Sequence, residues 1–194
     1  MSVAWTMQSA PLMQSSLVQV VGYDGSPLSE LGLRRAVEEA MRTDFAVVHV
    51  VAVVEAVGTL VKMPDGTLLN PWAGLSALRL TVRELLRTWA VSDQLVHVVA
   101  HVTTGDPGPT LVDLAARLEA NSITVGLCGA GSSHGPTVGS VARYLARNST
   151  CKVHLQSLLV PREQARPSDP LRLYLVLGDG FTLPGAPLPR MARA

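Results

Sequence analysis

The chain has 194 residues, the length of one typical domain. Hydrophobic residues make up 47% of it and charged residues only 16%, a composition that excludes intrinsic disorder. The formal net charge is +1, so no basic excess favours binding to nucleic acid. Two cysteines, Cys128 and Cys151, are too few for a disulfide framework and fit a reducing compartment. We therefore expect a cytoplasmic protein.

The chain divides into three parts. Residues 1–16 contain no Lys or Arg and no continuous apolar run, which predicts a flexible extension and not a secretory signal. Residues 17–160 hold the predicted domain, and residues 161–194 form a Pro- and Arg-rich C-terminal extension. The most apolar segment, 45–61, carries a histidine and a glutamate and is shorter than the ~20 residues that a spanning helix needs. We expect no membrane span.

The first half of the chain predicts a strand, a helix and a second strand. The strand 17–23 leads into Asp24-Gly25-Ser26-Pro27, a turn whose proline suits the first helical position. The helix after it is expected to direct four apolar residues inward, namely Leu33, Val37, Ala40 and Met41. Residues 45–54 are a continuous β-branched run, typical of a strand buried on both faces of a parallel sheet. A connection over 55–71 follows, with a turn at Pro64-Asp65-Gly66.

The second half continues this alternation. A helix over 75–89 carries Arg79, Arg83 and Arg87 on its outer face, which indicates either a solvated face or a patch that binds a partner. Gly105-Asp106-Pro107 opens a third helix, and a fourth begins near Gly139. The three remaining predicted strands cover 95–103, 123–125 and 153–160.

Strands that alternate with helices predict an α/β fold with a five-stranded parallel sheet in the order 3-2-1-4-5 and helices on both faces, as in Rossmann-like proteins. In this order the first and fourth strands lie side by side, at the point where the winding reverses. Ligands bind at the carboxyl ends of the strands at such a point. We therefore expect a site between Asp24 and the loop that follows Val125.

The fifth predicted strand, 153–160, lies at an edge of this sheet. Unpaired backbone groups and the apolar residues Leu155 and Leu158 favour pairing with a second copy of the chain. The alternative is that the C-terminal extension, through a stretch such as 171–177, folds back and covers the edge within one chain.

A glycine-rich loop follows the fourth predicted strand. Gly126, Gly129, Gly139 and Ser140 fall in the pattern G-x2-G-x9-G-S. Glycines let backbone N–H groups approach an anion, and a helix that begins near Gly139 offers unpaired N–H groups to phosphate. The hydroxyl of Ser140 can add a hydrogen bond.

This loop, in this place in the chain, resembles the nucleotide-binding members of the universal stress protein family. The resemblance extends over 17–160 and includes Tyr23-Asp24-Gly25-Ser26, His49-Val50-Val51 and Gly105-Asp106-Pro107. It implies a stress-response or signalling module that binds ATP, alone or with Mg²⁺, and that dimerises through strand 153–160.

The resemblance also implies roles for particular residues. Gly22 and Asp24 would lie beside the nucleoside, and Val50 would meet the adenine through its backbone. The segments 126–132 and 139–142 would hold the ribose and the phosphates, the second through Gly139, Ser140 and Val141.

Other functions compete with this interpretation. The segment 127–138 contains no Lys or Arg, so a dimeric interaction protein of the same fold without nucleotide is the main alternative. A slow ATPase comes third, because the lysine of a Walker A loop is missing. Asp24 could simply cap the first helix. His97 and His101 share one strand face, but without a further ligand nearby we do not expect a metal site.

Overall fold

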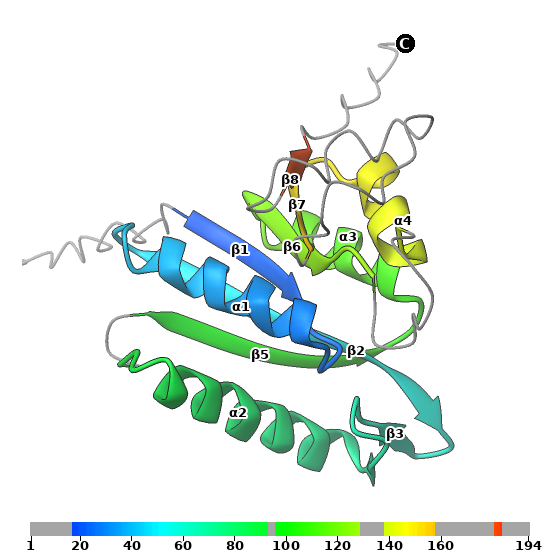
Figure 1. Ribbon diagram of the computed structural model, residues 1–194. Helices are drawn as coiled ribbons and strands as arrows, with labels where there is room; N and C mark the ends of the chain where they lie inside the picture. The colour runs from blue at the N-terminus through cyan, green and yellow to red at the C-terminus, as the bar shows by residue number, and fades with distance from the viewer. Residues whose placement is uncertain (1–16, 93–95, 129–137, 158–180, 184–194) are drawn as a thin grey trace, which may run out of the picture.

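The computed structural model describes residues 17–92, 96–128, 138–157 and 181–183. Strands and helices alternate along the domain as the sequence predicts (Figure 1). In chain order the elements are β1 (Leu17–Gly22), α1 (Pro27–Ala40), β2 (Ala46–Val57), β3 (Leu60–Lys62), β4 (Leu68–Leu69), α2 (Pro71–Thr88), β5 (His97–Thr104), α3 (Pro107–Arg117), β6 (Ser122–Gly126), α4 (Ser140–Asn148), β7 (Lys152–Gln156) and β8 (Phe181–Leu183).

Three of the four helices in the described part of the chain begin in the same way, with a polar cap followed by proline. The side chains of Ser26, Asn70 and Asp106 accept hydrogen bonds from backbone N–H groups in the first turns of α1, α2 and α3. The fourth helix, α4, differs because its N-cap is Gly139, which has no side chain to accept such a bond. At the end of α1, Met41 is 46% exposed as the C-cap residue, so the expectation that it faces inward is wrong.

The sheet is mixed, and the prediction of a purely parallel five-stranded sheet is therefore wrong. Its parallel pairings run β5–β2–β1–β6–β7. Three short strands, β3, β4 and β8, add antiparallel pairings to this core. Strands β2 and β3 form a hairpin, because β2 continues to Val57 and the chain then reverses at Gly58, whose φ of +61° suits glycine.

The edge at β7 is covered by the chain itself. Strand β8 pairs antiparallel with β7, with Val153 opposite Leu183 and Leu155 opposite Phe181. The expectation of an unpaired edge here is wrong, and the alternative of a tail that folds back is confirmed for residues 181–183. Residues 158–160 and 171–177 lie outside the described part of the chain. The homodimer through 153–160 stays a prediction, without support from an open edge at β7.

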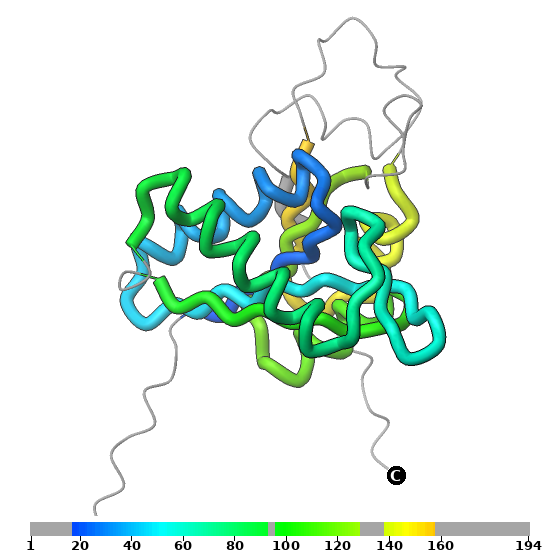
Figure 2. Tube along the Cα trace, turned by 90° about the horizontal axis from the view of Figure 1, so that it is seen from below, coloured from blue at the N-terminus to red at the C-terminus, as the bar shows by residue number. Residues whose placement is uncertain are grey.

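Two apolar clusters cover the two faces of the sheet. Figure 2 shows α1 and α2 on one side of the sheet and α3 on the other. Because side chains alternate along a strand, Val21 belongs to the cluster under α1 and α2, and Val20 to the cluster under α3 and α4. No helix among the described residues is long and apolar enough to cross a membrane.

Candidate functional site

A cavity of about 380 Å³ opens where the parallel strands end. Its walls come from the carboxyl ends of β1, β2 and β6 and from the first turns of α3 and α4. The residues that line it are Gly22, Tyr23, Asp24, Val51, Val53, Pro107, Leu111, Val125, Gly126, Cys128, Gly139, Ser140, Val141 and Ala142. The cavity lies at the reversal of winding, because β1 pairs with β2 on one side and with β6 on the other.

Most of the predicted site residues meet around this cavity. Gly22 and Asp24 follow β1, Gly126 ends β6, and Gly139, Ser140 and Val141 open α4. More than a hundred positions separate the first group from the last. The sheet brings them together because β1 and β6 are neighbours, with Val20 opposite Ile123.

One predicted residue is not part of this wall, and another lies outside the described residues. Val50 is fully buried in the cluster under α1 and α2, on the opposite face of the sheet. Its neighbours Val51 and Val53 line the cavity instead, because alternate residues of β2 point to alternate faces. Gly129 lies outside the described residues.

Two of the site glycines are confined by their neighbours. A Cβ atom on Gly22 would lie 2.9 Å from Cγ1 of Val125 and 3.0 Å from Cδ1 of Leu111, inside the cavity wall. A Cβ atom on Gly126 would lie 3.0 Å from the carbonyl oxygen of Cys128 and from Cβ of Leu28. At both positions glycine therefore lets the backbone pack against these neighbours, where a side chain would not fit.

Asp24 shapes the turn that follows β1. Its Oδ1 accepts hydrogen bonds from the backbone N–H of Ser26 at 3.0 Å and from the hydroxyl of Ser26 at 2.6 Å. Ser26 Oγ in turn accepts from the N–H of Ser29, so Ser26 is the N-cap of α1 and Asp24 supports it. The alternative that Asp24 itself caps the helix is wrong, and its carboxylate lies on the cavity wall.

The charge of the described cavity wall comes from a single carboxylate. Asp24 is the only Asp, Glu, Lys, Arg or His among the lining residues given above. Burial raises the pKa of the neighbouring Tyr23 phenol, and the carboxylates of Glu30 and Asp24 act in the same direction. Tyr23 is thus a neutral hydroxyl at neutral pH.

The beginning of α4 supplies hydrogen-bond donors to the cavity. The N–H of Gly139 donates to the carbonyl of Leu127 at 2.7 Å, which fixes the helix start beside the end of β6. The next residues, Ser140, Val141 and Ala142, line the cavity and form the first turn of a helix that has no side-chain cap. First-turn N–H groups and the positive end of the helix dipole suit a phosphate or another anion.

Sequence reasoning missed some lining residues. Pro107 and Leu111 belong to α3, and they reach the cavity because that helix packs over the neighbouring strands β1 and β6. The sequence alone does not show this packing. Cys128, by contrast, lies in the segment 126–132 that was expected at the site, and it does line the cavity.

A histidine pair lies on the sheet between β2 and β5. Nδ1 of His49 is 2.9 Å from Nε2 of His101, a hydrogen bond that needs at least one neutral ring. Burial lowers the pKa of His49 to about 4, and His101 and His97 act in the same direction. No cluster of three or more His, Cys, Asp or Glu suited to a metal exists among the described residues.

Comparisons with solved structures agree with this architecture. The chain is similar to a universal stress protein from Lactobacillus plantarum, with 21% identity, a TM-score of 0.56, and coverage of 73% of this chain and 97% of that one. It is similar to one from Archaeoglobus fulgidus, with 21% identity, a TM-score of 0.53, and coverage of 73% and 93%. It is also similar to a universal stress protein in complex with cAMP, with 23% identity, a TM-score of 0.52, and coverage of 73% and 96%.

No curated protein matches the chain significantly. A match to a family is nevertheless clear, because the sequence model of the universal stress protein family matches residues 20–155. The matched segment runs from within β1 to within β7, so it includes most of the parallel core and the described wall of the cavity. The chain belongs to the universal stress protein family.

Proposed function

We propose that this protein binds an adenine nucleotide, with ATP as the leading ligand, in the cavity between β1 and β6. The observation that supports the proposal is the shared wall of this cavity: glycines and Asp24 on one side, and the uncapped start of α4 on the other. A volume of about 380 Å³ lies within the range of small-molecule pockets. A structural neighbour from the same family is in complex with cAMP, which supports an adenine ligand of this kind.

The wall residues fit the parts of such a ligand. Gly22 and Gly126 let the wall pack closely at the ends of β1 and β6, and the apolar side chains of Val51, Val53 and Leu111 suit the face of a base. The carboxylate of Asp24 can accept a hydrogen bond from a ribose hydroxyl or an amino group. The N–H groups at the start of α4, with the Ser140 hydroxyl, can donate to phosphate oxygens. Any Mg²⁺ would be held chiefly by the phosphates, since the described residues offer no metal cluster.

We propose a binding or signalling module and not an enzyme. Asp24, Tyr23, Cys128 and Ser140 are the described lining side chains with ionisable or hydroxyl groups, and the described lining includes no histidine and no lysine. Efficient phosphoryl transfer relies on cations that neutralise the developing charge. A phosphate-release assay should show turnover far below the ~10 s⁻¹ of a median enzyme. Several turnovers per second would move the protein into the enzyme class.

The variant Ser140→Asp provides a sharp test of the proposed phosphate position. Ser140 is exposed and is the first residue of α4, where a carboxylate interacts favourably with the helix dipole, so the fold should be retained. The same carboxylate would compete with the phosphates for the N–H groups and repel them. Calorimetry should show ATP binding weakened by about ten-fold or more and adenosine binding almost unchanged. The matched control is Ser140→Asn, which adds no charge.

The main competing function is an interaction module of the same fold that binds no nucleotide. The absence of Lys and Arg from the described cavity wall favours it, because no side-chain cation offsets a triphosphate there. Wild-type protein that gives no heat with ATP, cAMP or adenosine at about 1 mM would support this alternative. Equal binding of ATP by wild type and Ser140→Asp would place the phosphates elsewhere.

A further inference from the structure

The two edges of the parallel core, β7 and β5, differ in whether a further strand pairs with them. At one side β7 is paired with β8 from the C-terminal extension. At the other side β5 pairs with β2 over eight positions, His97 opposite Val47 through Thr104 opposite Val54. Within the described part of the chain no strand pairs with the outer side of β5. A row of backbone N–H and C=O groups therefore faces outward along β5.

Strand β5 also lacks the features that usually protect a sheet edge. Its sequence, HVVAHVTT, contains no Pro, Gly or Lys, and five of its eight residues are β-branched. Edge strands that avoid pairing are typically short or carry Pro, Lys or a bulge. Strand β5 is long for an edge and regular, so it can accept an added strand.

A groove follows this edge. One hollow of about 490 Å³ lies between β5 and α2, where Arg79, Val82 and Arg83 form its helical wall. A second hollow of about 300 Å³ shares Ala100 with the first and continues along β5 to Thr103. Its walls are Leu75 of α2 on one side and Leu114 and Arg117 of α3 on the other. A strand placed beside β5 would thus lie between two helices.

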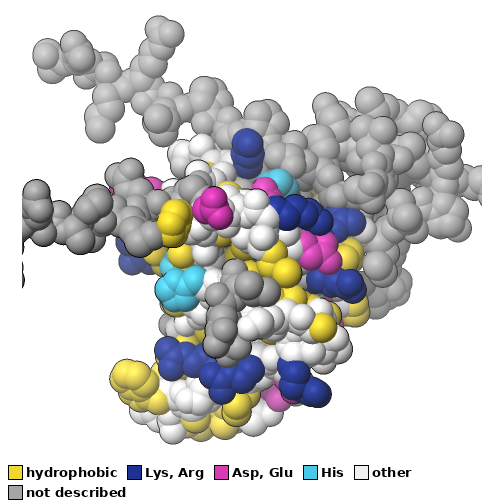
Figure 3. Space-filling model, turned by 90° about the vertical axis from the view of Figure 1, so that its left-hand side faces the viewer, with side chains coloured by type: hydrophobic (Ala, Val, Ile, Leu, Met, Phe, Trp, Pro, Cys, Tyr) yellow, Lys and Arg dark blue, Asp and Glu magenta, His cyan; other side chains and the backbone are white. Residues whose placement is uncertain are grey.

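The groove is basic. Arg79, Arg83 and Arg117 are exposed, and among the described residues no carboxylate lines either hollow. Within the described residues these three arginines make no ion pair, whereas the nearby Arg87 is bonded to Glu84 at 2.6 Å. Figure 3 looks at the end of the molecule where α2 stops and β5 starts, and Lys and Arg side chains gather there over α2. A nearly neutral protein therefore concentrates positive charge along the edge of β5, and within the described part of the chain this charge is not neutralised by ion pairs.

We propose that the outer edge of β5 binds an extended acidic segment of a partner protein, which adds to the sheet as a further strand. Its backbone would pair with β5. Alternate side chains of the added strand would point to the two faces of the sheet, so carboxylates on one face would meet Arg79 and Arg83 and those on the other face would meet Arg117. This surface is separate from the nucleotide cavity, with which it shares no lining residue.

A second copy of the chain is a poorer occupant. Antiparallel pairing of β5 with its own copy would set the two α2 helices on the same face of a continuous sheet. The unpaired Arg79 and Arg83 of both copies would then approach one another, and like charges at an interface disfavour association. An acidic strand instead neutralises the arginines.

Fluorescence anisotropy with a labelled peptide of about ten residues, built from Thr, Val and Glu, tests the proposal, since this length spans β5. We expect saturable binding that weakens at about 0.5 M salt. Arg79→Glu/Arg83→Glu should bind about ten-fold more weakly or worse, while Arg147→Glu, a change at an exposed arginine of α4, should bind as wild type does. The same peptide with alternate amides N-methylated keeps its charge but loses backbone donors, and should not bind.

Three results would overturn the proposal. Equal binding of the N-methylated peptide would show attraction by charge without strand addition. Equal binding by Arg79→Glu/Arg83→Glu would place the peptide elsewhere. A wild-type dimer in sedimentation, dissociated by the same double change, would make a second copy the occupant of the edge.

Discussion

Replacement of Asp24 separates a structural role from a ligand-binding role at the end of β1. Oδ1 of Asp24 accepts two hydrogen bonds from Ser26, at 3.0 Å from the backbone N–H and at 2.6 Å from the hydroxyl. Asp24→Ala removes both and leaves the two partly buried donors without this acceptor. At about 1–1.5 kcal/mol for each bond, the free energy of unfolding should fall by about 2–3 kcal/mol. Asp24→Asn keeps an oxygen in the same place and should cost about 1 kcal/mol or less.

The effect on binding should follow a different order. A ligand hydroxyl or amino group bonded to the carboxylate would lose about 1.5–3 kcal/mol of binding energy in either variant, roughly a ten- to hundred-fold loss of affinity. Asp24→Asn should therefore bind ATP weakly while it folds almost normally. Urea denaturation gives the stability and calorimetry gives the affinity. Affinity in Asp24→Asn equal to that of wild type would refute a contact between the carboxylate and the ligand, and unchanged stability in Asp24→Ala would refute the hydrogen-bond argument.

Three further predictions concern other parts of the molecule. Gly126→Val should lower both stability, by about 1–3 kcal/mol, and ATP affinity, because a Cβ there meets the carbonyl of Cys128 at 3.0 Å; unchanged melting and titration curves would contradict this. His49 has a pKa lowered to about 4 in the folded protein against an ordinary 6.5, so the unfolded state binds more protons between these values. The free energy of unfolding should therefore reach its full value above pH 6.5 and fall by about 1–2 kcal/mol toward pH 4, a figure reduced for solvent screening. Urea titrations at several pH values should show a weaker pH dependence in His49→Gln, and His101 should account for what remains. Deletion of residues 181–194 removes β8 and exposes the edge of β7, so light scattering should show more self-association than in the full chain, and an equally monomeric truncated chain would argue against a protective role of β8.

The sequence determined the elements of the domain and the place of the candidate site because both depend on local signals. Polar caps followed by proline at Ser26 and Asp106 start two helices, and the valine-rich run of β2 is typical of a buried parallel strand. The start of α2 at Asn70-Pro71 was missed, because residues 55–71 were predicted to be a connection. The alternation of strands and helices places the ends of β1 and β6 together through the handedness of the crossovers. Glycines in a loop at that point then indicate an anion site.

The tertiary structure decided what depends on register and on contacts between distant segments. The side chain of Val51 lines the cavity and that of Val50 does not, because the two side chains point to opposite faces of β2. The cavity lies on the face covered by α3 and α4, and Val50 is buried under α1 and α2. His49 meets His101 because β2 and β5 pair with His49 opposite Val99, which sets the two histidines on a diagonal. Local sequence carries no information on this register.

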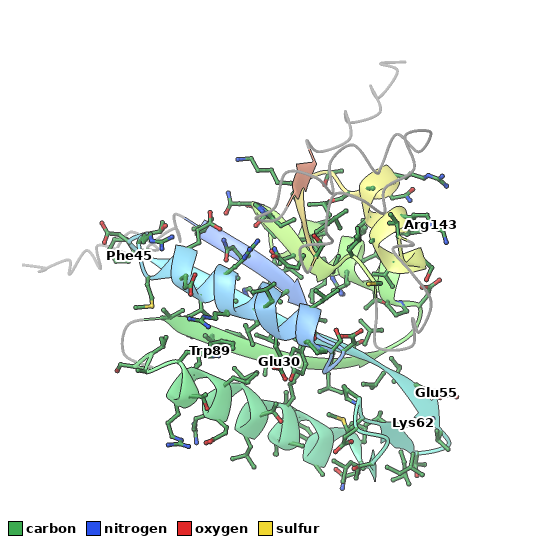
Figure 4. The ribbon with its side chains drawn as sticks, viewed as in Figure 1. Glu30, Phe45, Glu55, Lys62, Trp89 and Arg143 are labelled. Carbon is green, nitrogen blue, oxygen red and sulfur yellow. The ribbon has the colours of Figure 1, made fainter. Side chains whose placement is uncertain are left out.

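The short strands were beyond sequence reasoning for the same reason. A strand of two or three residues has no periodicity to detect, so β3, β4 and β8 exist only through their partners. Figure 4 shows Glu55 and Lys62 side by side on the hairpin, at the opposite end of β2 from Phe45. Phe45, predicted to begin that strand, lies outside it with a φ of +57° and is 59% exposed, because β2 pairs with β1 only from Ala46 onward. Backbone pairing, which is not local, thus decided where the sheet begins, which of its edges is covered and which stays open.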